Sequence, residues 1–209
     1  KNITAFILEK GMEGITLGEE EHKLGLHSSS TRQVFLNDVK VSIESMLGGR
    51  GNGFKIAMNA LNVGRMKLSA AILDACRRVI DLSTKYSNER IQFGIPISKF
   101  GAIKQKLADM AVRTYAIESA TYRAGDDIEQ NILRLQSEGI DQQEAYLKGI
   151  EEYAIECSIA KVLGSETIQF CSDEGIQIYG VRLLGKLFDR NRTTEITDLG
   201  FSMAFNYGF

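Results

Sequence analysis

Apolar residues recur at helical spacing along the chain from Phe54 onward. In the first such segment the apolar positions are three, four or seven residues apart: Leu61, Leu68, Ile72, Ala75, Val79, Leu82 and Tyr86. A stripe of this period lies along one face of an α-helix, where it can be buried against a neighbouring element. The pattern therefore predicts one long amphipathic helix from Phe54 to near Asn88.

A second helical segment follows Pro96, which is the only proline of the chain. Its apolar face comprises Ile103, Leu107, Met110, Thr114 and Ile117. We expect this helix to begin near Lys99 with Ser98 as its N-cap, because a serine hydroxyl can accept a hydrogen bond from a free N–H group of the first turn. We expect it to fray past Gly125 into the polar stretch 134–143.

A third helix is predicted from about Gln142 to Phe170. Its stripe comprises Ala154, Cys157, Lys161, Gly164 and Ile168. A last short helix is expected over residues 165–179, overlapping the end of the third. Long helices with heptad-like spacing are typical of an antiparallel helical bundle.

Residues 1–50 carry a different pattern, which is typical of β-structure. The runs 3-ITAFILE-9 and 33-QVFLNDVKV-41 are rich in β-branched and aromatic residues, and an Asn-Asp pair in the second run predicts a turn. The glycine-rich segment 48–53 lacks the Gly-Lys-Ser/Thr ending of a phosphate-binding loop, so we interpret it as a connector. Strands that precede the helices, instead of alternating with them, predict an α+β fold.

Composition and charge exclude several classes of function. The 209 residues include 25 Lys and Arg against 27 Asp and Glu, a net charge of -2 that offers no basic surface for nucleic acid. No apolar run reaches the length of a membrane span. We expect Cys76, Cys157 and Cys171 to be buried small hydrophobes of a reduced, cytoplasmic protein. With His22 and His27 as the only histidines, no metal site is predicted.

The first of three polar clusters is 90-RIQFG-94. The planar guanidinium of Arg90 can bind a pyrophosphate through two parallel hydrogen bonds, and the ring of Phe93 can stack on a purine. The alternative is structural: an arginine at the end of a helix, favoured by the helix dipole, with a phenylalanine packed beneath it.

The other two clusters lie near the start of the first helix and at the end of the last one. In 61-LNVGRMKLSAA-71, Asn62 and Arg65 interrupt an apolar segment, and the alternative interpretation is a solvated first turn. In 175-GIQIYG-180, Gln177 and Gly180 flank an Ile-Tyr pair, and the alternative is a helix that ends at a glycine C-cap.

These clusters, with their flanking residues, resemble blocks of the acyl-CoA dehydrogenase family. Residues 33–71 resemble the family's passage from its middle β-domain into its C-terminal helices, with Ser42 where proline is usual. ERIQFG…FGAIKQKLADMA resembles the block between the first two long helices, and SDEGIQIYG resembles a block near the end of the helical domain. The likeness covers residues 3 to 180 in the family's order and is greatest to the very-long-chain branch.

The resemblance implies an FAD-dependent oxidoreductase of fatty acid β-oxidation and lipid metabolism. Such a flavoprotein dehydrogenates an acyl-CoA thioester between its α- and β-carbons and passes the electrons to an electron-transferring flavoprotein. It implies that Arg90, Gln92 and Phe93 contact the FAD of a neighbouring subunit, in a homodimer or homotetramer. Gln177 and Gly180 match residues that contact the same FAD.

Asn62 and Arg65 match positions where the family approaches its acyl-CoA substrate. Beyond Gly180 the pattern is lost, because Val181 replaces a glycine and the family's catalytic glutamate is not identified. Because the chain opens inside a strand-like run without an initiator methionine, we expect a fragment. Its expected parts are the end of the middle β-domain at 1–50, the helical bundle domain at 51–180 and a diverged tail at 181–209. The alternatives are a non-catalytic helical module that oligomerises or binds a partner, and an inactive truncated product.

Overall fold

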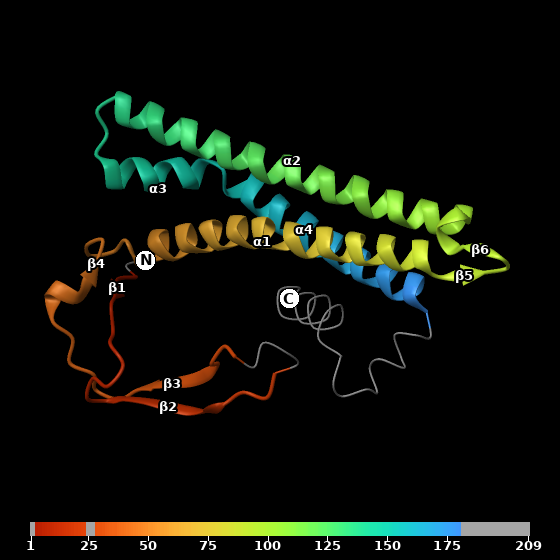
Figure 1. Ribbon diagram of the computed structural model, residues 1–209. Coiled ribbons are helices and arrows are strands. Elements are labelled where there is room, and N and C mark those ends of the chain that lie inside the picture. The colour runs from red at the N-terminus through yellow and green to blue at the C-terminus, as the bar shows by residue number, and fades with distance from the viewer. Residues whose placement is uncertain (1–2, 24–27, 181–209) are drawn as a thin grey trace.

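The computed structural model describes residues 3–23 and 28–180, and within them the fold is α+β, with a helical bundle preceded by small β-sheets (Figure 1). The helices are α1 (Gly53–Glu89), α2 (Gly101–Ser137), α3 (Gln142–Glu152) and α4 (Ala154–Tyr179). In Figure 1, α2 runs back along α1, and α3 and α4 together return beside them. The predicted fold class is confirmed.

The bundle core is built by the stripes that the sequence predicted. The main cluster of buried apolar residues joins α1, α2 and α4: Ile72, Ala75, Cys76, Val79, Tyr86, Met110, Ile168, Cys171 and Ile178. Leu61 is an exception, because it belongs to the same heptad but is 51% exposed. It lies near the start of α1, on a face that the other described elements leave uncovered.

Helix α2 is longer than the sequence predicted. It continues without fraying past Gly125 to Ser137, so the expected fraying is wrong. The reason is tertiary, since Ile132 and Leu135 are buried against Ala145 of α3 in a second apolar cluster. Packing against α3 thus keeps the polar end of α2 helical, although that segment would be a marginal helix in isolation.

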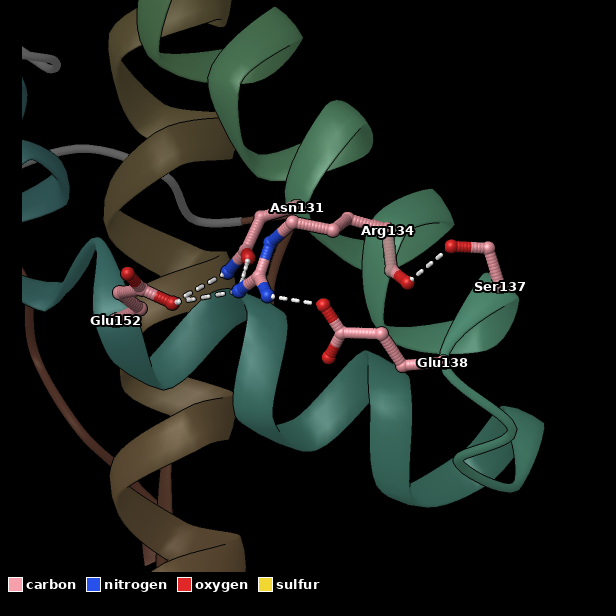
Figure 2. Close-up of polar contacts among 5 residues, drawn as sticks. All are labelled: Asn131, Arg134, Ser137, Glu138 and Glu152. Atoms are coloured by element: carbon pink, nitrogen blue, oxygen red, sulfur yellow. Dashed lines mark hydrogen bonds and ion pairs between the residues drawn. The ribbon is translucent and has the colours of Figure 1, made fainter.

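A polar network fastens α3 to the end of α2 (Figure 2). Arg134 donates from Nη2 to Oδ1 of Asn131 and from Nη1 to Oε1 of Glu138, each at 2.7 Å. Asn131, which is buried, donates in turn to Oε2 of Glu152 on α3, also at 2.7 Å. Ser137 Oγ donates to the carbonyl of Arg134 at 2.6 Å. One arginine therefore ties together the end of α2, the loop after it and α3.

The single third helix expected over 142–170 is instead two helices. The chain breaks at Tyr153, whose φ of -101° and ψ of 25° are not helical, and α4 then continues to Tyr179, where a separate short helix was expected. Neither proline nor glycine stands at the break. The change of direction lets α3 pack on α2 while α4 packs mainly on α1 (Figure 1).

The start of α2 also differs from the prediction. Phe100, not Ser98, is the N-cap residue, and it makes no side-chain capping bond. Ser98 lies two residues earlier, in the short 3-10 helix Ile97–Lys99. That turn follows a hairpin made of β5 (Ile91–Gln92) and β6 (Ile95–Pro96), which connects α1 to the start of α2.

The region before α1 forms two antiparallel strand pairs. The strands are β1 (Ala5–Phe6) with β4 (Met46–Leu47), and β2 (Ile15–Glu20) with β3 (Arg32–Leu36). They are shorter than the predicted runs, and β2 was not expected because a glycine and acidic residues interrupt its apolar pattern. The turn predicted after β3 is confirmed, with Asp38 at a φ of 48°. The glycine-rich segment connects β4 to α1, as interpreted.

The described β-segment has little core of its own. All five residues of β3 are exposed, among them Val34 at 59% and Phe35 at 48%. The buried apolar clusters of the described chain consist of residues from the helices. In the part of the chain that the structure covers, no helix combines the length and the apolarity needed to cross a membrane.

Candidate functional site

The hairpin between α1 and α2 ends in a two-residue turn formed by Phe93 and Gly94. Gln92 pairs with Ile95 on either side of it. Both turn residues have positive φ, 51° for Phe93 and 80° for Gly94. This is the signature of a type I′ turn, which matches the twist of the two strands and favours Asn and Gly.

Phe93 is an unusual residue for that position. A bulky side chain in the left-handed region is a genuine outlier, and such strain is concentrated at binding and switch sites. Phe93 is also 93% exposed, and its ring lies edge-on to that of Phe100, with 6.2 Å between the ring centroids. The alternative interpretation, in which Phe93 packs beneath the helix end, is therefore wrong.

Arg90 lies at the base of the same hairpin, as the C-cap residue of α1. Its N–H donates to the carbonyl of Tyr86 at 2.9 Å, and its carbonyl accepts from the N–H of Ile97 at 2.8 Å. The backbone of Arg90 is thus fixed at both ends. Its side chain is exposed, and within the described residues the guanidinium makes no recorded hydrogen bond or ion pair, so the charge is free to meet an anion.

A pair of stacked tyrosines brings the end of α4 to the same end of the bundle. The rings of Tyr86 and Tyr179 lie 4.3 Å apart between centroids, at an interplanar angle of 11°. The Tyr179 hydroxyl also donates to the carbonyl of Leu82 at 3.3 Å. Because Tyr86 lies one turn before Arg90, the stack holds the last turns of the two helices together (Figure 1).

Gln177 and Gly180 lie on that last turn of α4. The Gln177 side chain is exposed, and its Oε1 accepts a hydrogen bond from Nζ of Lys106 at 2.7 Å. Gly180 is the C-cap, with φ 57° and ψ -146°, a conformation that is essentially restricted to glycine. The C-cap that was the alternative interpretation of this cluster is therefore present, and Gly180 itself has no side chain.

Asn62 and Arg65 lie towards the opposite end of α1. At about 1.5 Å per residue they are roughly 35 Å along the helix from Tyr86. Arg65 Nη1 donates to Asn62 Oδ1 at 2.9 Å, and Asn62 is only 4% exposed. A solvated first turn, the alternative for this pair, is therefore wrong for Asn62. The structure separates this pair from the five residues at the other end.

A small apolar cavity of about 200 Å³ lies beside Asn62, between the helices. Its lining comes from all four helices and includes Asn62, Val63, Gly125, Ile128, Ile150 and Cys157. A wider cavity of about 500 Å³ between α1 and α2 shares Met66, Lys67 and Gly125 with it. Gly64, on the same turn of α1 as Asn62, is exposed, and a β-carbon there would meet no atom within 4 Å.

The three cysteines lie inside the helical bundle. All three are free and buried, as expected. A hydrogen bond to the Cys171 thiol and burial raise the pKa of Cys76, and burial raises the pKa of Cys157. Among the described residues, no three His, Cys, Asp or Glu side chains are grouped so that they could hold a metal ion.

The sequence did not single out Lys106, Tyr86 and Tyr179 as parts of the site. Tyr86 was predicted only as an apolar stripe residue, and Lys106 lies on the polar side of α2. Contacts between helices that are far apart in sequence give these residues their roles, and no local pattern in the sequence marks such contacts.

Comparison with known proteins gives one consistent result. The acyl-CoA dehydrogenase C-terminal domain family matches residues 51–198. A probable acyl-CoA dehydrogenase of Bacillus subtilis is 45% identical over 177 residues, which are 85% of this chain and 30% of that protein. A very long-chain specific mitochondrial acyl-CoA dehydrogenase of Macaca fascicularis is 37% identical over 180 residues, 86% of this chain and 25% of that protein.

A solved structure is similar over almost the whole chain. The crystal structure of an acyl-CoA dehydrogenase complexed with FAD from Bacillus anthracis has a TM-score of 0.86 at 39% identity, and covers 99% of this chain and 34% of that one. The chain thus spans between a quarter and about a third of the length of these relatives.

Proposed function

The chain belongs to the acyl-CoA dehydrogenase family, and from this premise we propose that it supplies the helical part of an FAD-dependent fatty acyl-CoA dehydrogenase. The reaction would remove hydrogen from the α- and β-carbons of an acyl-CoA thioester. When bound, the flavin would accept the hydride that leaves the β-carbon. The electrons would then pass to an electron-transferring flavoprotein.

The end of the bundle at the hairpin is chemically suited to the pyrophosphate and adenosine of FAD. The observation that carries this proposal is the common position of Arg90, Phe93 and Gln177, which the Tyr86–Tyr179 stack holds at one end. Arg90 offers a cation without a recorded partner in the described chain, and the exposed ring of Phe93 offers a flat apolar surface. Such groups bind a phosphate and a purine ring, respectively.

Gln92 and Gly180 are the other two residues of the proposed FAD site. Gln92 lies in the hairpin strand beside Phe93, with its side chain exposed. Gly180 has no side chain, so a ligand can approach the backbone at the end of α4. We therefore propose that Arg90, Gln92, Phe93, Gln177 and Gly180 bind FAD.

The substrate would bind at the other end of α1, near Asn62 and Arg65. The separation of roughly 35 Å along α1 favours an arrangement in which the hairpin reaches the FAD of a neighbouring copy. A homodimer or homotetramer follows from this proposal, because each flavin would then be completed by two chains. We assign no catalytic base among the described residues, and the tail at 181–209, with Val181, lies outside them.

The domain organisation that we propose follows the change of pattern along the chain. Residues 1–50 would be the end of a middle β-domain, 51–180 the helical bundle domain and 181–209 a tail. The exposed apolar residues of β3 support this division, because a strand of a larger β-domain would be covered by its neighbours. We further propose a cytoplasmic setting, which the three free, buried thiols support.

A second candidate function is a non-catalytic helical module that oligomerises. Large apolar side chains exposed on the outer faces of α2 and α4 favour it: Val112, Tyr115, Tyr122, Ile155 and Ile159. Contiguous exposed apolar surface often marks a protein–protein interface. A colourless protein that forms a stable dimer or tetramer would support this candidate over the flavoprotein.

Titration with FAD tests the proposed function. We expect the purified protein to quench flavin fluorescence on binding and Arg90→Ala to raise the Kd for FAD by about tenfold, because a charge-assisted hydrogen bond is lost. Arg123→Ala is a matched control, since Arg123 is an exposed arginine on α2 that pairs with Asp127. Absence of FAD binding, or equal effects of the two substitutions, would contradict the proposal.

A further inference from the structure

Lys106 of α2 reaches across to α4 and contacts two of its side chains. Its Nζ donates to Oε1 of Gln177 at 2.7 Å and forms an ion pair with Oε2 of Glu174. Glu174 and Gln177 are three residues apart and therefore lie on the same face of α4. The ion pair is partly shielded, with side-chain exposures of 26% for Lys106 and 16% for Glu174.

The chemistry of lysine decides how the Gln177 amide is oriented. An ammonium group has three donors and no acceptor, whereas the glutamine amide has one acceptor oxygen and one donor nitrogen. Only Oε1 can therefore face Lys106, and Nε2 must point elsewhere. Nε2 makes no recorded hydrogen bond to the described residues, and the Gln177 side chain is exposed. The amide thus presents its two N–H donors outward.

Glu174 has two effects on this arrangement. The ion pair already restricts the flexible lysine side chain. Less conformational entropy is therefore lost when Lys106 binds Gln177. Glu174 also offsets the charge of Lys106, so that Lys106 itself offers little net charge to a ligand. The contact between Lys106 and Gln177 is therefore suited to orientation more than to attraction of an anion.

We propose that Lys106 is a positioning residue, which fixes the Gln177 amide so that Nε2 donates to an acceptor oxygen in the pyrophosphate–ribose part of FAD. This inference rests on the proposed function, because it takes Gln177 to be an FAD contact. It adds a residue that does not itself touch the cofactor, and it states which atom of Gln177 does.

A purely structural role for Lys106 leads to different expectations. If the Lys106–Glu174 pair only joined α2 to α4, its removal would lower stability and leave FAD affinity unchanged in the folded protein. If Gln177 bound the cofactor through its carbonyl oxygen, a carboxylate at that position would still provide the acceptor. FAD affinity and unfolding, measured on the same variants, distinguish these two alternatives from the proposed roles of Lys106 and Gln177.

The first experiment compares Gln177→Glu with Gln177→Ala, using FAD as the ligand and the Kd from fluorescence titration as the readout. Gln177→Glu keeps the shape and the contact with Lys106 but replaces the donor by an acceptor. We expect it to raise the Kd by more than Gln177→Ala does, because a carboxylate oxygen would face an acceptor oxygen of the ligand. A Gln177→Glu variant that binds as well as Gln177→Ala or better would overturn the assigned orientation.

The second experiment tests the coupling of the two residues in a double-mutant cycle. Lys106→Met is expected to raise the Kd for FAD by about fivefold in the wild-type chain, and by less than about twofold in the Gln177→Ala chain. Lys106→Arg, which keeps a donor, should restore most of the affinity. The variant Lys106→Met with Glu174→Gln controls for the unpaired carboxylate, and urea unfolding of every variant separates stability from affinity.

The results of these experiments separate the positioning role of Lys106 from the FAD contact of Gln177. If Gln177→Ala weakens FAD binding but Lys106→Met does not, or if their effects simply add, the positioning role is wrong and the FAD contact stands. If the wild-type chain fails to bind FAD, or Gln177→Ala leaves the Kd unchanged, the proposed FAD contact itself is wrong.

Discussion

Phe93 shows how a single residue can be kept in a costly conformation. The type I′ turn requires positive φ at both of its central residues, and asparagine or glycine would satisfy it with less strain. The chain instead carries a phenylalanine at 51°, with its ring in solvent. A left-handed conformation of a bulky residue costs on the order of 1 kcal/mol or more. Binding of a ligand by the ring would explain why the strain persists.

We therefore predict that Phe93→Asn stabilises the protein and weakens FAD binding. The free energy of unfolding should rise by about 1 kcal/mol, because asparagine tolerates the left-handed region. The Kd for FAD should increase, because the aromatic surface is lost. Urea unfolding and FAD titration measure the two effects. Gly94→Ala is the control and should lower stability, and a Phe93→Asn variant that is less stable than wild type would contradict the strain argument.

Glu20 provides a prediction about protonation. Hydrogen bonds from Ser30 and Arg32 lower its pKa from the ordinary 4.5 to about 2. The folded-state pKa is depressed, so the contribution to stability is complete above pH 4.5 and is lost as the pH falls from 4.5 towards 2. An NMR titration of the Glu20 carboxyl carbon should give a midpoint near 2. Arg32→Ala should raise this midpoint. A wild-type midpoint of 4.5 would show that Ser30 and Arg32 do not hydrogen-bond to Glu20.

At the scale of elements, the pairing of α2 with α3 depends on close approach. Gly149 of α3 is buried, and a β-carbon there would overlap Cγ1 of Ile132 on α2. The same pairing keeps α2 helical to Ser137. The Arg134 network in Figure 2 supports it at the surface, where individual ion pairs contribute little to stability.

We predict that Gly149→Ala destabilises the bundle even though alanine is the better helix former. Overpacking of a buried contact costs roughly 1–3 kcal/mol, which exceeds the gain in helix propensity of about 1 kcal/mol or less. Gly64→Ala is the matched control, because a β-carbon there meets no atom within 4 Å and should raise stability. Denaturant unfolding compares the two. An equal increase in the free energy of unfolding for both substitutions would show that α3 does not pack closely on α2.

At the scale of the whole molecule, much apolar surface remains uncovered in the described chain. Phe54 and Leu61 of α1 are 60% and 51% exposed, and Tyr115 of α2 is 73% exposed. Exposed apolar residues on several faces are typical of an interaction surface. The proposed FAD site points to the same conclusion, because the hairpin lies at the opposite end of α1 from the proposed substrate position (Figure 1).

We predict that FAD promotes self-association. A ligand that binds between two copies stabilises their complex by mass action. Saturating FAD should therefore shift sedimentation towards a dimer or tetramer at a fixed protein concentration, as measured by analytical ultracentrifugation. Arg90→Ala should remove the shift, whereas Arg123→Ala should not. Identical sedimentation with and without FAD would contradict the shared site.

The sequence by itself determined the fold class, the family and the position of α1. Heptad spacing from Leu68 to Tyr86 predicted a helix with the buried face that is observed, because periodicity records burial directly. The guanidinium of Arg90 beside Phe93 suggested a dinucleotide contact, and the family resemblance implied the same contact for Gln177. Local pattern was enough for these inferences because each depends on residues that are close together in the chain.

Only the tertiary structure decided the length of α2, the break at Tyr153 and the composition of the site. The polar end of α2 is helical because α3 packs on it, and the chain breaks at Tyr153 as α3 leaves α2 and α4 turns to α1. Arg90 and Gln177 share one end of the bundle because Tyr86 stacks on Tyr179, a contact between residues far apart in sequence. Lys106 meets Gln177 through another contact between residues far apart in sequence. The physical reason is that periodicity shows which face of a helix is buried but does not show which distant segment packs against that face.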